Sequence, residues 1–220
     1  RRVKIARKMK AVTNFGVTVV HSGPGYGKST IVASFAPTFD AISCWYTATD
    51  FDDELIPFLR YVVHSIRNRI RQFGEGLLSY VNKMDRYIRE EEIQDLCTLF
   101  INEIAQIDEP LILIIDDFHF VQKNPEIVTW FHWLLQHIPS NLHLILITRE
   151  KPNWEVITAM KVKNELLEIT EEDLKFTREE VEVLLEDIYM LEVEIDDIEQ
   201  IYTLSEGWVM ALGLLSQRLA

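Results

Sequence analysis

A glycine-rich stretch near the N-terminus combines residue types and spacing that suit the binding of a phosphate chain. Residues 17–30 read VTVVHSGPGYGKST, which matches the signature G-x-x-x-x-G-K-[ST] except that Ser22 replaces the first glycine. Such a loop needs converging backbone N–H groups, a close approach of the backbone and one flexible cation. We therefore expect a nucleotide to contact the residues of this glycine loop: Ser22, Gly23, Pro24, Gly25, Tyr26, Gly27, Lys28, Ser29 and Thr30.

The residues of the glycine loop have distinct expected roles. Gly23, Gly25 and Gly27 permit the positive φ angles of a phosphate cradle, because they carry no side chain. We expect Lys28 to reach the β- and γ-phosphates and the Ser29 hydroxyl to ligate Mg²⁺, with the following helix pointing its positive end at the anion. Serine at position 22 is compatible with the turn. The alternative is a strand–turn–helix whose lysine is merely exposed.

In the stretch LILIIDDFHFV two aspartates follow an apolar run, and they form a second group of candidate site residues. A buried strand that ends in carboxylates brings them to the carboxyl edge of a sheet, where ligands bind in doubly wound folds. We expect Asp116 to hold Mg²⁺ through water and Asp117 to orient or deprotonate the attacking water. In the alternative interpretation Asp117 only caps the following turn. His119 could assist in the site, but we interpret it as an exposed loop residue.

The stretch HLILITRE supplies a third group. In the usual topology its strand lies between the strand of the glycine loop and the strand of the aspartates. That position directs Thr148 toward the attacking water and Arg149 toward the γ-phosphate, where a cation stabilises developing charge. Alternatively, Arg149 pairs with Glu150 or faces solvent.

The elements that must position these residues alternate along the chain. Apolar or β-branched runs predict strands at 16–21, 42–48, 110–116, 143–148 and 166–170. Amphipathic segments between them predict helices at 28–36, 53–72, 90–107, 125–138 and 154–161. This alternation is typical of an α/β fold with a doubly wound, parallel, five-stranded sheet, whose expected strand order is 5-1-4-3-2.

After residue 170 the predicted strands stop and helices follow one another. Thr177 and Glu180 form a capping box at the start of the first of these helices. Its inward face is expected to comprise Val181, Leu184, Leu185, Ile188 and Leu191, and that of the next helix Ile198, Ile201 and Leu204. We predict a nucleotide-binding domain over 1–171 and a small, lid-like helical domain over 172–220, truncated at its C-terminal end.

Composition narrows the classes of partner. The formal net charge of −13 over 220 residues argues against contact with nucleic acid by this part of the protein. The basic residues cluster at 1–10 and at 67–72, where we expect solvated helical faces. Cys44 and Cys97 have no metal-binding spacing, so we expect buried, reduced thiols and a cytoplasmic location. No apolar run is long enough to span a bilayer, so we expect no membrane partner.

Taken in order, several stretches resemble the STAND-class signal-transducing ATPases, in particular the maltose-regulon activator type of large ATP-binding LuxR-class regulators. The stretches are SGPGYGKST, CWYTATDFDDELIPFLRYVVHSI, LILIIDDFHFV, LILITRE and LLEITEEDLKFTREEVEVLL…SEGWVMALGLL.

The resemblance implies a P-loop NTPase fold and an ATP/ADP switch between assembled and resting states. It also implies self-association or contact with other domains of the same protein, and a DNA-binding module elsewhere. It further implies that Gly207 and the helix after it contact adenine, although Val209 stands where related ATPases have proline.

The leading hypothesis is therefore a regulatory domain that binds ATP or ADP with Mg²⁺ and hydrolyses ATP slowly. A phosphotransferase acting on a small molecule is the alternative, with 72–90 as the only segment that could supply an acceptor lid. A DNA-remodelling or loader ATPase is disfavoured by the negative charge.

Overall fold

The computed structural model describes residues 2–84, 88–190 and 194–219. Its centre is a parallel five-stranded sheet with the order β2-β3-β4-β1-β5. The strands are β1 (Val17–His21), β2 (Ile42–Thr47), β3 (Leu111–Asp116), β4 (Leu142–Thr148) and β5 (Leu166–Ile169). Read from the β5 edge, this is the expected order 5-1-4-3-2, which is confirmed. β4 lies between the strands that end in the glycine loop and in the aspartates.

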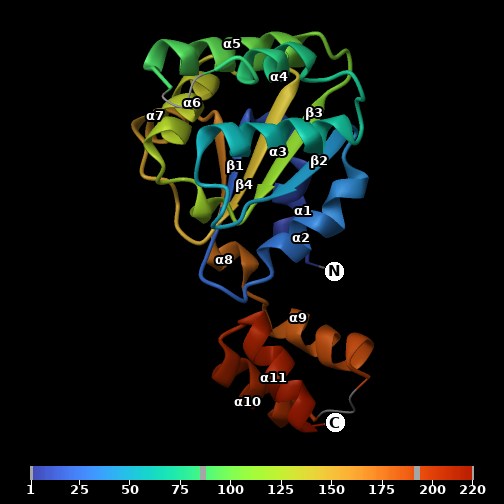
Figure 1. Ribbon diagram of the computed structural model, residues 1–220. Coiled ribbons are helices and arrows are strands. Elements are labelled where there is room, and N and C mark those ends of the chain that lie inside the picture. The colour runs from blue at the N-terminus through green and yellow to red at the C-terminus, as the bar shows by residue number, and fades with distance from the viewer. Residues whose placement is uncertain (1, 85–87, 191–193, 220) are drawn as a thin grey trace.

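Helices cover both faces of the sheet (Figure 1). Alternate residues of the central strands face opposite layers: Leu113 and Leu144 belong to one buried cluster, and Ile114 and Ile145 to the other. The first cluster includes residues of α3 (Leu55–Arg67), α4 (Glu75–Val81), α5 (Glu90–Ala105), α6 (Pro125–Gln136) and α7 (Glu155–Val162). The second includes residues of α1 (Val3–Lys10) and α2 (Lys28–Phe35). Because both faces are covered, β3 and β4 are buried along their whole length.

The first basic cluster forms the expected solvated helical face, with Lys4, Arg7 and Lys10 exposed, and the second does not. The first forms α1, whose charged side chains flank a buried stripe containing Ile5 and Met9. In the second, the helix ends at Arg67 instead of continuing to residue 72. The chain turns there because the Arg67 guanidinium donates to the carbonyl of Phe73 at 2.6 Å, and Gly74 then adopts a φ of +79°. Both cysteines are buried and free, as expected.

After β5 come α8 (Glu171–Leu174), α9 (Arg178–Val183), α10 (Ile195–Ser205) and α11 (Val209–Leu219), with a π-helical turn, η4 (Leu184–Ile188), extending α9. Leu174 of α8 packs with the α1 and α2 face of the sheet. The remainder, residues 176–219, is called here the helical tail and has its own buried cluster of Val181, Leu184, Leu185, Ile198, Ile201 and Leu212. The domain boundary between residues 171 and 172 stays a prediction.

The capping box is confirmed: the Thr177 hydroxyl accepts from the N–H of Glu180, whose carboxylate accepts from the N–H of Thr177. Two expected inward residues are instead exposed, Ile188 at 66% and Leu204 at 72%. Ile188 lies in the π-helical turn, where the wider turn rotates side chains away from the helical spacing assumed from sequence. On α10, Ile198, Ile201 and Ser205 make up the inward face, and Leu204 points outward. Leu191 lies outside the described residues.

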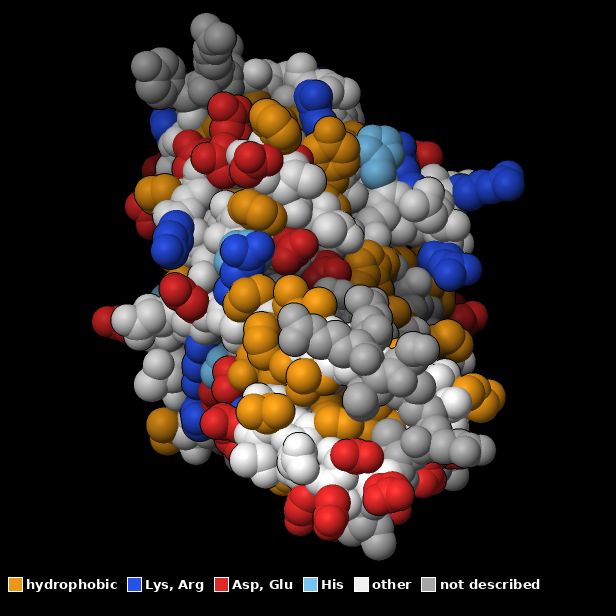
Figure 2. Space-filling model, turned by 90° about the horizontal axis from the view of Figure 1, so that it is seen from below, with side chains coloured by type: hydrophobic (Ala, Val, Ile, Leu, Met, Phe, Trp, Pro, Cys, Tyr) orange, Lys and Arg blue, Asp and Glu red, His pale blue; other side chains and the backbone are white. Residues whose placement is uncertain are grey.

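The helical tail lies beneath the carboxyl edge of the sheet (Figure 1) and is tied to α1. Arg2 forms an ion pair with Glu180 at 3.0 Å, donates to the carbonyls of Leu174 and Lys175, and stacks over the ring of Phe176. Seen from below, hydrophobic side chains gather in the middle of the face and acidic ones at its lower edge (Figure 2). None of the described helices combines the length and apolar character needed to cross a membrane.

Candidate nucleotide-binding site

The glycine loop joins the end of β1 to the start of α2. Gly25 and Gly27 have φ angles of +76° and +75°, a region that L-residues with a side chain rarely adopt, and Gly27 caps the helix. Gly23 has no positive φ, so only two of the three expected glycines use this conformation. Ser22 is buried, and its hydroxyl donates to the carbonyl of Gly23. Serine at this position is thus accommodated without a left-handed backbone.

Lys28 begins α2 and its side chain folds back over the loop. Its ammonium donates to the carbonyl oxygens of Ser22 at 2.9 Å and Gly23 at 2.8 Å. Burial lowers the pKa of Lys28, and the charge of Arg149 lowers it further, whereas the charges of Asp117 and Asp116 raise it. These charged groups therefore surround the lysine at the carboxyl edge of the sheet, as the sequence predicts.

Asp116 and Ser29 lie in direct contact at the end of β3. The Ser29 hydroxyl donates to Oδ1 of Asp116 at 2.9 Å, and the N–H of Asp117 donates to the same oxygen at 2.9 Å. Burial raises the pKa of Asp116, opposed by these two hydrogen bonds. A hydroxyl and a carboxylate are the hard oxygen ligands that Mg²⁺ prefers, so the pair suits the ion that would accompany a nucleotide. Ser29 and Asp116 would hold it, and the ion would neutralise phosphate charge.

Asp117 follows with a φ of 52° and a side chain that is 47% exposed. It is the residue before the 3-10 turn η3 (Phe118–Phe120), but its carboxylate makes no capping hydrogen bond to that turn. The capping alternative is therefore not supported, and the carboxylate is accessible at the site.

His119 is not the exposed bystander that the sequence analysis assumed. Its side chain is only 14% exposed, and both ring nitrogens are buried with no hydrogen-bond partner among the described residues. Nδ1 lies 3.7 Å from Oδ1 of Asp117. Burial lowers the pKa of His119, and Arg149 lowers it further. The expectation was wrong because it took a turn residue for a solvated one, whereas the buried neighbour Phe118 draws this turn against the core.

Thr148 and Arg149 both lie at the carboxyl edge of the sheet, but Thr148 is buried and Arg149 is exposed. Thr148 is 1% exposed, and its hydroxyl lies 3.0 Å from both Oε1 of Gln122 and the carbonyl oxygen of Glu150. Its single proton is thus shared between protein acceptors, and its role toward a water stays a prediction. Arg149 is exposed, and the described ion pairs include none between Arg149 and Glu150. The buried Gln122 was missed because nothing in the sequence ties it to Thr148.

The start of α11 lies on the glycine loop. The indole N–H of Trp208 donates to the carbonyl of Pro24 at 3.3 Å. A Cβ atom built on Gly25 would lie 2.7 Å from the sulfur of Met210. The ring centroids of Trp208 and Tyr26 lie 6.0 Å apart. Sequence reasoning pointed to this segment through Gly207 but did not single out Trp208 or Met210.

Gly207 itself packs against the backbone of Phe176. It has a φ of +75°, and its carbonyl accepts from the N–H of Phe176 at 2.9 Å. A Cβ there would lie 2.3 Å from the carbonyl oxygen of Phe176, so glycine is needed for the chain to turn into α11.

Of the remaining expected residues, Thr30 is exposed in the first turn of α2. Partial burial raises the pKa of Tyr26, and the nearby Glu171 carboxylate raises it further.

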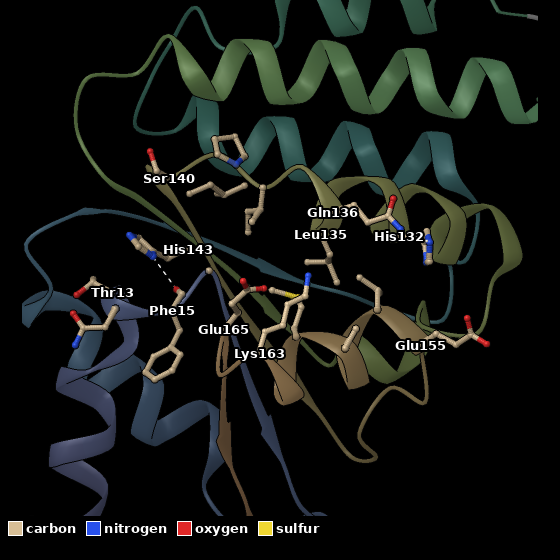
Figure 3. A pocket seen from close by; sticks show the side chains of 18 residues that line it. Thr13, Phe15, His132, Leu135, Gln136, Ser140, His143, Glu155, Lys163 and Glu165 are labelled. Atoms are coloured by element: carbon tan, nitrogen blue, oxygen red, sulfur yellow. Dashed lines mark hydrogen bonds between the residues drawn. The ribbon is translucent and has the colours of Figure 1, made fainter.

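A separate cavity of about 780 Å³ opens at the opposite, amino edge of the sheet (Figure 3). It is lined by residues that precede β1 and β4 together with side chains of α6 and α7, and His143 Nδ1 contacts the carbonyl of Phe15 at its wall. Lys163 and Glu165 also lie there. None of the residues expected to bind nucleotide contributes to this cavity.

Comparison with known proteins agrees with this architecture. No protein-family model matches the chain. The HTH-type transcriptional regulator MalT of Yersinia enterocolitica is 28% identical over 218 residues, which cover 98% of this chain and 23% of MalT. The chain thus spans about a quarter of the length of the curated relatives it matches.

Among solved structures, a STAND protein with a tetratricopeptide-repeat sensor from Pyrococcus horikoshii superposes with a TM-score of 0.59 at 17% identity, covering 96% of this chain and 29% of that one. A Walker-type ATPase of Pyrococcus abyssi gives 0.56 at 12% identity, covering 98% and 65%. The expected resemblance is therefore confirmed: the chain has the P-loop ATPase fold and is similar, over nearly its whole length, to a large LuxR-class regulator of the MalT type.

Proposed function

We propose that this chain is the nucleotide-binding switch domain of a cytoplasmic transcriptional regulator. It binds ATP or ADP with Mg²⁺ at the glycine loop and hydrolyses ATP slowly. The bound nucleotide gates assembly, through self-association or contact with other domains of the same protein. A DNA-binding module lies elsewhere in the full protein, and this part makes no contact with nucleic acid.

The observation that carries the proposal is the contact between the glycine loop and the aspartate strand. The 2.9 Å bond from Ser29 to Asp116 joins two segments 87 residues apart in sequence, at the carboxyl edge where Lys28 also lies. A hydroxyl, a buried carboxylate and an ammonium in this arrangement suit a Mg²⁺–polyphosphate and have no evident role in a bare scaffold. The similarity to MalT, which is named a transcriptional regulator, supports the regulatory part of the proposal.

Slow hydrolysis follows from the length of one side chain. Asp117 occupies the position where fast P-loop ATPases commonly place glutamate, and aspartate is shorter by one methylene group. An attacking water would then be held less well, and each ~1.4 kcal/mol lost from its positioning lowers the rate about tenfold. A long-lived ATP state suits a switch better than it suits a metabolic catalyst.

The placement of residues 72–84 weakens the phosphotransferase alternative. They include α4, whose Leu77 and Val81 are buried in the main core. α4 lies beside α5 at the end of the molecule away from the helical tail (Figure 1). This part of the only candidate lid is therefore distant from the glycine loop.

The test compares two lysines at opposite edges of the sheet. We expect Lys28→Ala to weaken Mg-ATP binding about 10- to 100-fold, because hydrogen bonds to charged groups contribute about 1.5–3 kcal/mol. Lys163→Ala removes an exposed lysine at the amino-edge cavity and should leave affinity unchanged. Isothermal titration calorimetry measures both. Unchanged affinity in Lys28→Ala would remove the glycine loop from the proposal, and a loss in Lys163→Ala would move the site to the cavity.

A further inference from the structure

Arg2 lies at the junction between α8 and the helical tail and contacts both sides of it. The helix that it precedes, α1, is fixed because Ile5 and Met9 are buried against the sheet. On the α8 side, one terminal nitrogen of the guanidinium donates to the carbonyl oxygens of Leu174 at 2.7 Å and Lys175 at 2.8 Å. These carbonyls end α8, where a helix has no further backbone donors to bond them, so a cation is well placed there.

On the tail side the same guanidinium has two partners. Its Nε donates to Oε2 of Glu180 at 3.0 Å, and its central carbon lies 4.0 Å from the centre of the Phe176 ring. The side chains of Arg2 and Glu180 are only 19% and 16% exposed, so this ion pair is better shielded from solvent than a surface pair. One planar group with several N–H donors thus bridges the point where the chain passes from α8 into the tail.

Phe176 passes this restraint on to the start of α11. Its N–H donates to the carbonyl of Gly207 at 2.9 Å, and a Cβ on Gly207 would lie 2.3 Å from its carbonyl oxygen, so the two backbones are in close contact. Trp208 follows directly, and its indole N–H donates to the carbonyl of Pro24 in the glycine loop. A continuous series of contacts therefore leads from Arg2 to the glycine loop.

We propose that Arg2 is a positioning residue for the nucleotide site: its guanidinium fixes the angle between α8 and the helical tail, so that Trp208 and Met210 form a wall beside the glycine loop. This wall contacts the part of the nucleotide that lies beyond the phosphates. The described polar contacts of the Arg2 side chain all fall between residues 174 and 180, so its effect on a nucleotide passes through the tail. The inference rests on the proposed function, because it assigns a residue that acts on that same site from outside it.

A purely structural role for Arg2 predicts a different pattern from a positioning role. The tail has its own buried cluster, which includes Val181, Leu185 and Leu212. Loss of the Arg2 contacts should therefore leave the tail folded and change only how it lies on the glycine loop. If Arg2 merely stabilised the fold, every ligand of the site would be affected to the same degree.

ATP and bare tripolyphosphate, each with Mg²⁺, separate the two roles in isothermal titration calorimetry. Arg2→Met keeps an unbranched side chain but removes the guanidinium. We expect it to weaken Mg-ATP binding about fivefold or more, the lower range of coupling between sites, and to leave Mg-tripolyphosphate binding within about twofold of the parent. Arg7→Met, at an exposed position of the same helix, is the matched control and should change neither affinity. An Mg-ATP affinity that is unchanged or raised in Arg2→Met, or an equal loss for both ligands, overturns the proposal.

Two milder variants test the bridge itself. Glu180→Gln removes the ion pair but keeps a residue type that serves in a capping box. Arg2→Lys keeps the charge but replaces the planar fork with a single ammonium, which cannot reach both sides of the junction. We expect both to spare Mg-tripolyphosphate and to weaken Mg-ATP binding, Glu180→Gln by about two- to threefold and Arg2→Lys about as much as Arg2→Met. Parent affinity for Mg-ATP in either variant contradicts the bridging role.

The indole signal of Trp208 reports the position of the tail without any ligand. In a ¹H–¹⁵N spectrum this signal is assigned by its absence in Trp208→Phe. It should shift in Arg2→Met but not in Arg7→Met, because the indole bond to Pro24 depends on where the tail lies. An unchanged signal in Arg2→Met overturns the proposal. If the signal shifts but the parent binds neither Mg-ATP nor Mg-tripolyphosphate, the proposed function fails, whereas the control of the tail by Arg2 stands.

Discussion

Asp116 and Asp117 are adjacent residues with opposite surroundings, and this difference separates their expected roles. Asp116 is 7% exposed and accepts hydrogen bonds from Ser29 and from the N–H of Asp117. The Asp117 side chain is 47% exposed and turns away on a left-handed backbone. A buried carboxylate that is already oriented suits the neighbourhood of a metal ion, whereas an accessible one suits the orientation of water.

The left-handed conformation of Asp117 decides which substitution tests its role. Glycine adopts a φ of 52° without strain, so Asp117→Gly removes the carboxylate while preserving the turn. We expect hydrolysis to fall below detection while Mg-ATP affinity stays within about threefold of the parent, because the role we propose for Asp117 lies in the transition state. Single-turnover hydrolysis and calorimetry check this. Asp50→Gly, in an exposed loop, is the control and should behave as the parent does. Turnover by Asp117→Gly equal to that of the parent would exclude Asp117 from the reaction.

At the scale of elements, α1 acts as a brace between the sheet and α8. Lys8 and Lys4 both pair with Asp173, at 2.6 Å and 3.1 Å, and Asp173 also accepts from the N–H of Thr170. Burial acts to raise the pKa of Asp173, but these hydrogen bonds and charges lower it to about 2. A depressed pKa means that the ionised carboxylate stabilises the folded state above its unfolded pKa of about 3.9, and that this stabilisation is lost as pH falls toward 2.

We therefore expect Asp173→Asn to lower the free energy of unfolding by about 1.5–3 kcal/mol at pH 7. The deficit should shrink as pH falls from about 4 toward 2, because the parent carboxylate is then protonated as well. Urea unfolding at pH 7 and pH 3 measures the difference. Glu172→Gln, a neighbour whose side chain is 73% exposed, should change stability little. A deficit that does not depend on pH would show that the pair contributes through shape alone.

The elements also show which features the sequence can predict. The runs LILIID and LHLILIT are apolar because they are buried on both faces, so the strands were predictable, and their order followed from the usual topology of such folds. The Ser29–Asp116 contact was predictable because both residues have a fixed place in a known loop and strand. His119 and Gln122 were not, because their burial depends on how Phe118 packs against distant residues. The outward orientation of Ile188 was hidden for a similar reason, since a π-helical turn leaves no clear mark in sequence.

At the scale of the whole molecule, the helical tail and the glycine loop share one contact region. Trp208 hydrogen-bonds to Pro24, and Met210 packs at Gly25, whose backbone belongs to the expected phosphate cradle. Because the same loop faces both the tail and the expected phosphates, nucleotide binding and tail contact should influence each other.

Hydrogen–deuterium exchange tests this coupling. Addition of Mg-ADP should change the exchange of amides at 207–212 as well as at 22–30, because phosphates alter the loop against which Trp208 and Met210 pack. Lys28→Ala should abolish both changes at the same ligand concentration. Tripolyphosphate with Mg²⁺ serves as a comparison that lacks the base: a response confined to the loop would assign the tail response to adenine. If 207–212 are unaffected by Mg-ADP while 22–30 are protected, the tail is not part of the switch.

The two hydrogen bonds from Lys28 to the carbonyls of Ser22 and Gly23 have a thermodynamic consequence. These bonds orient the half-buried ammonium, so part of its dehydration and ordering is completed during folding. A phosphate oxygen that binds Lys28 would then replace these carbonyl oxygens rather than a full hydration shell around the ammonium. Preorganisation of this kind leaves more of the attraction between the two charges available as affinity. The folded loop would thus be preorganised for the polyphosphate that we propose it binds.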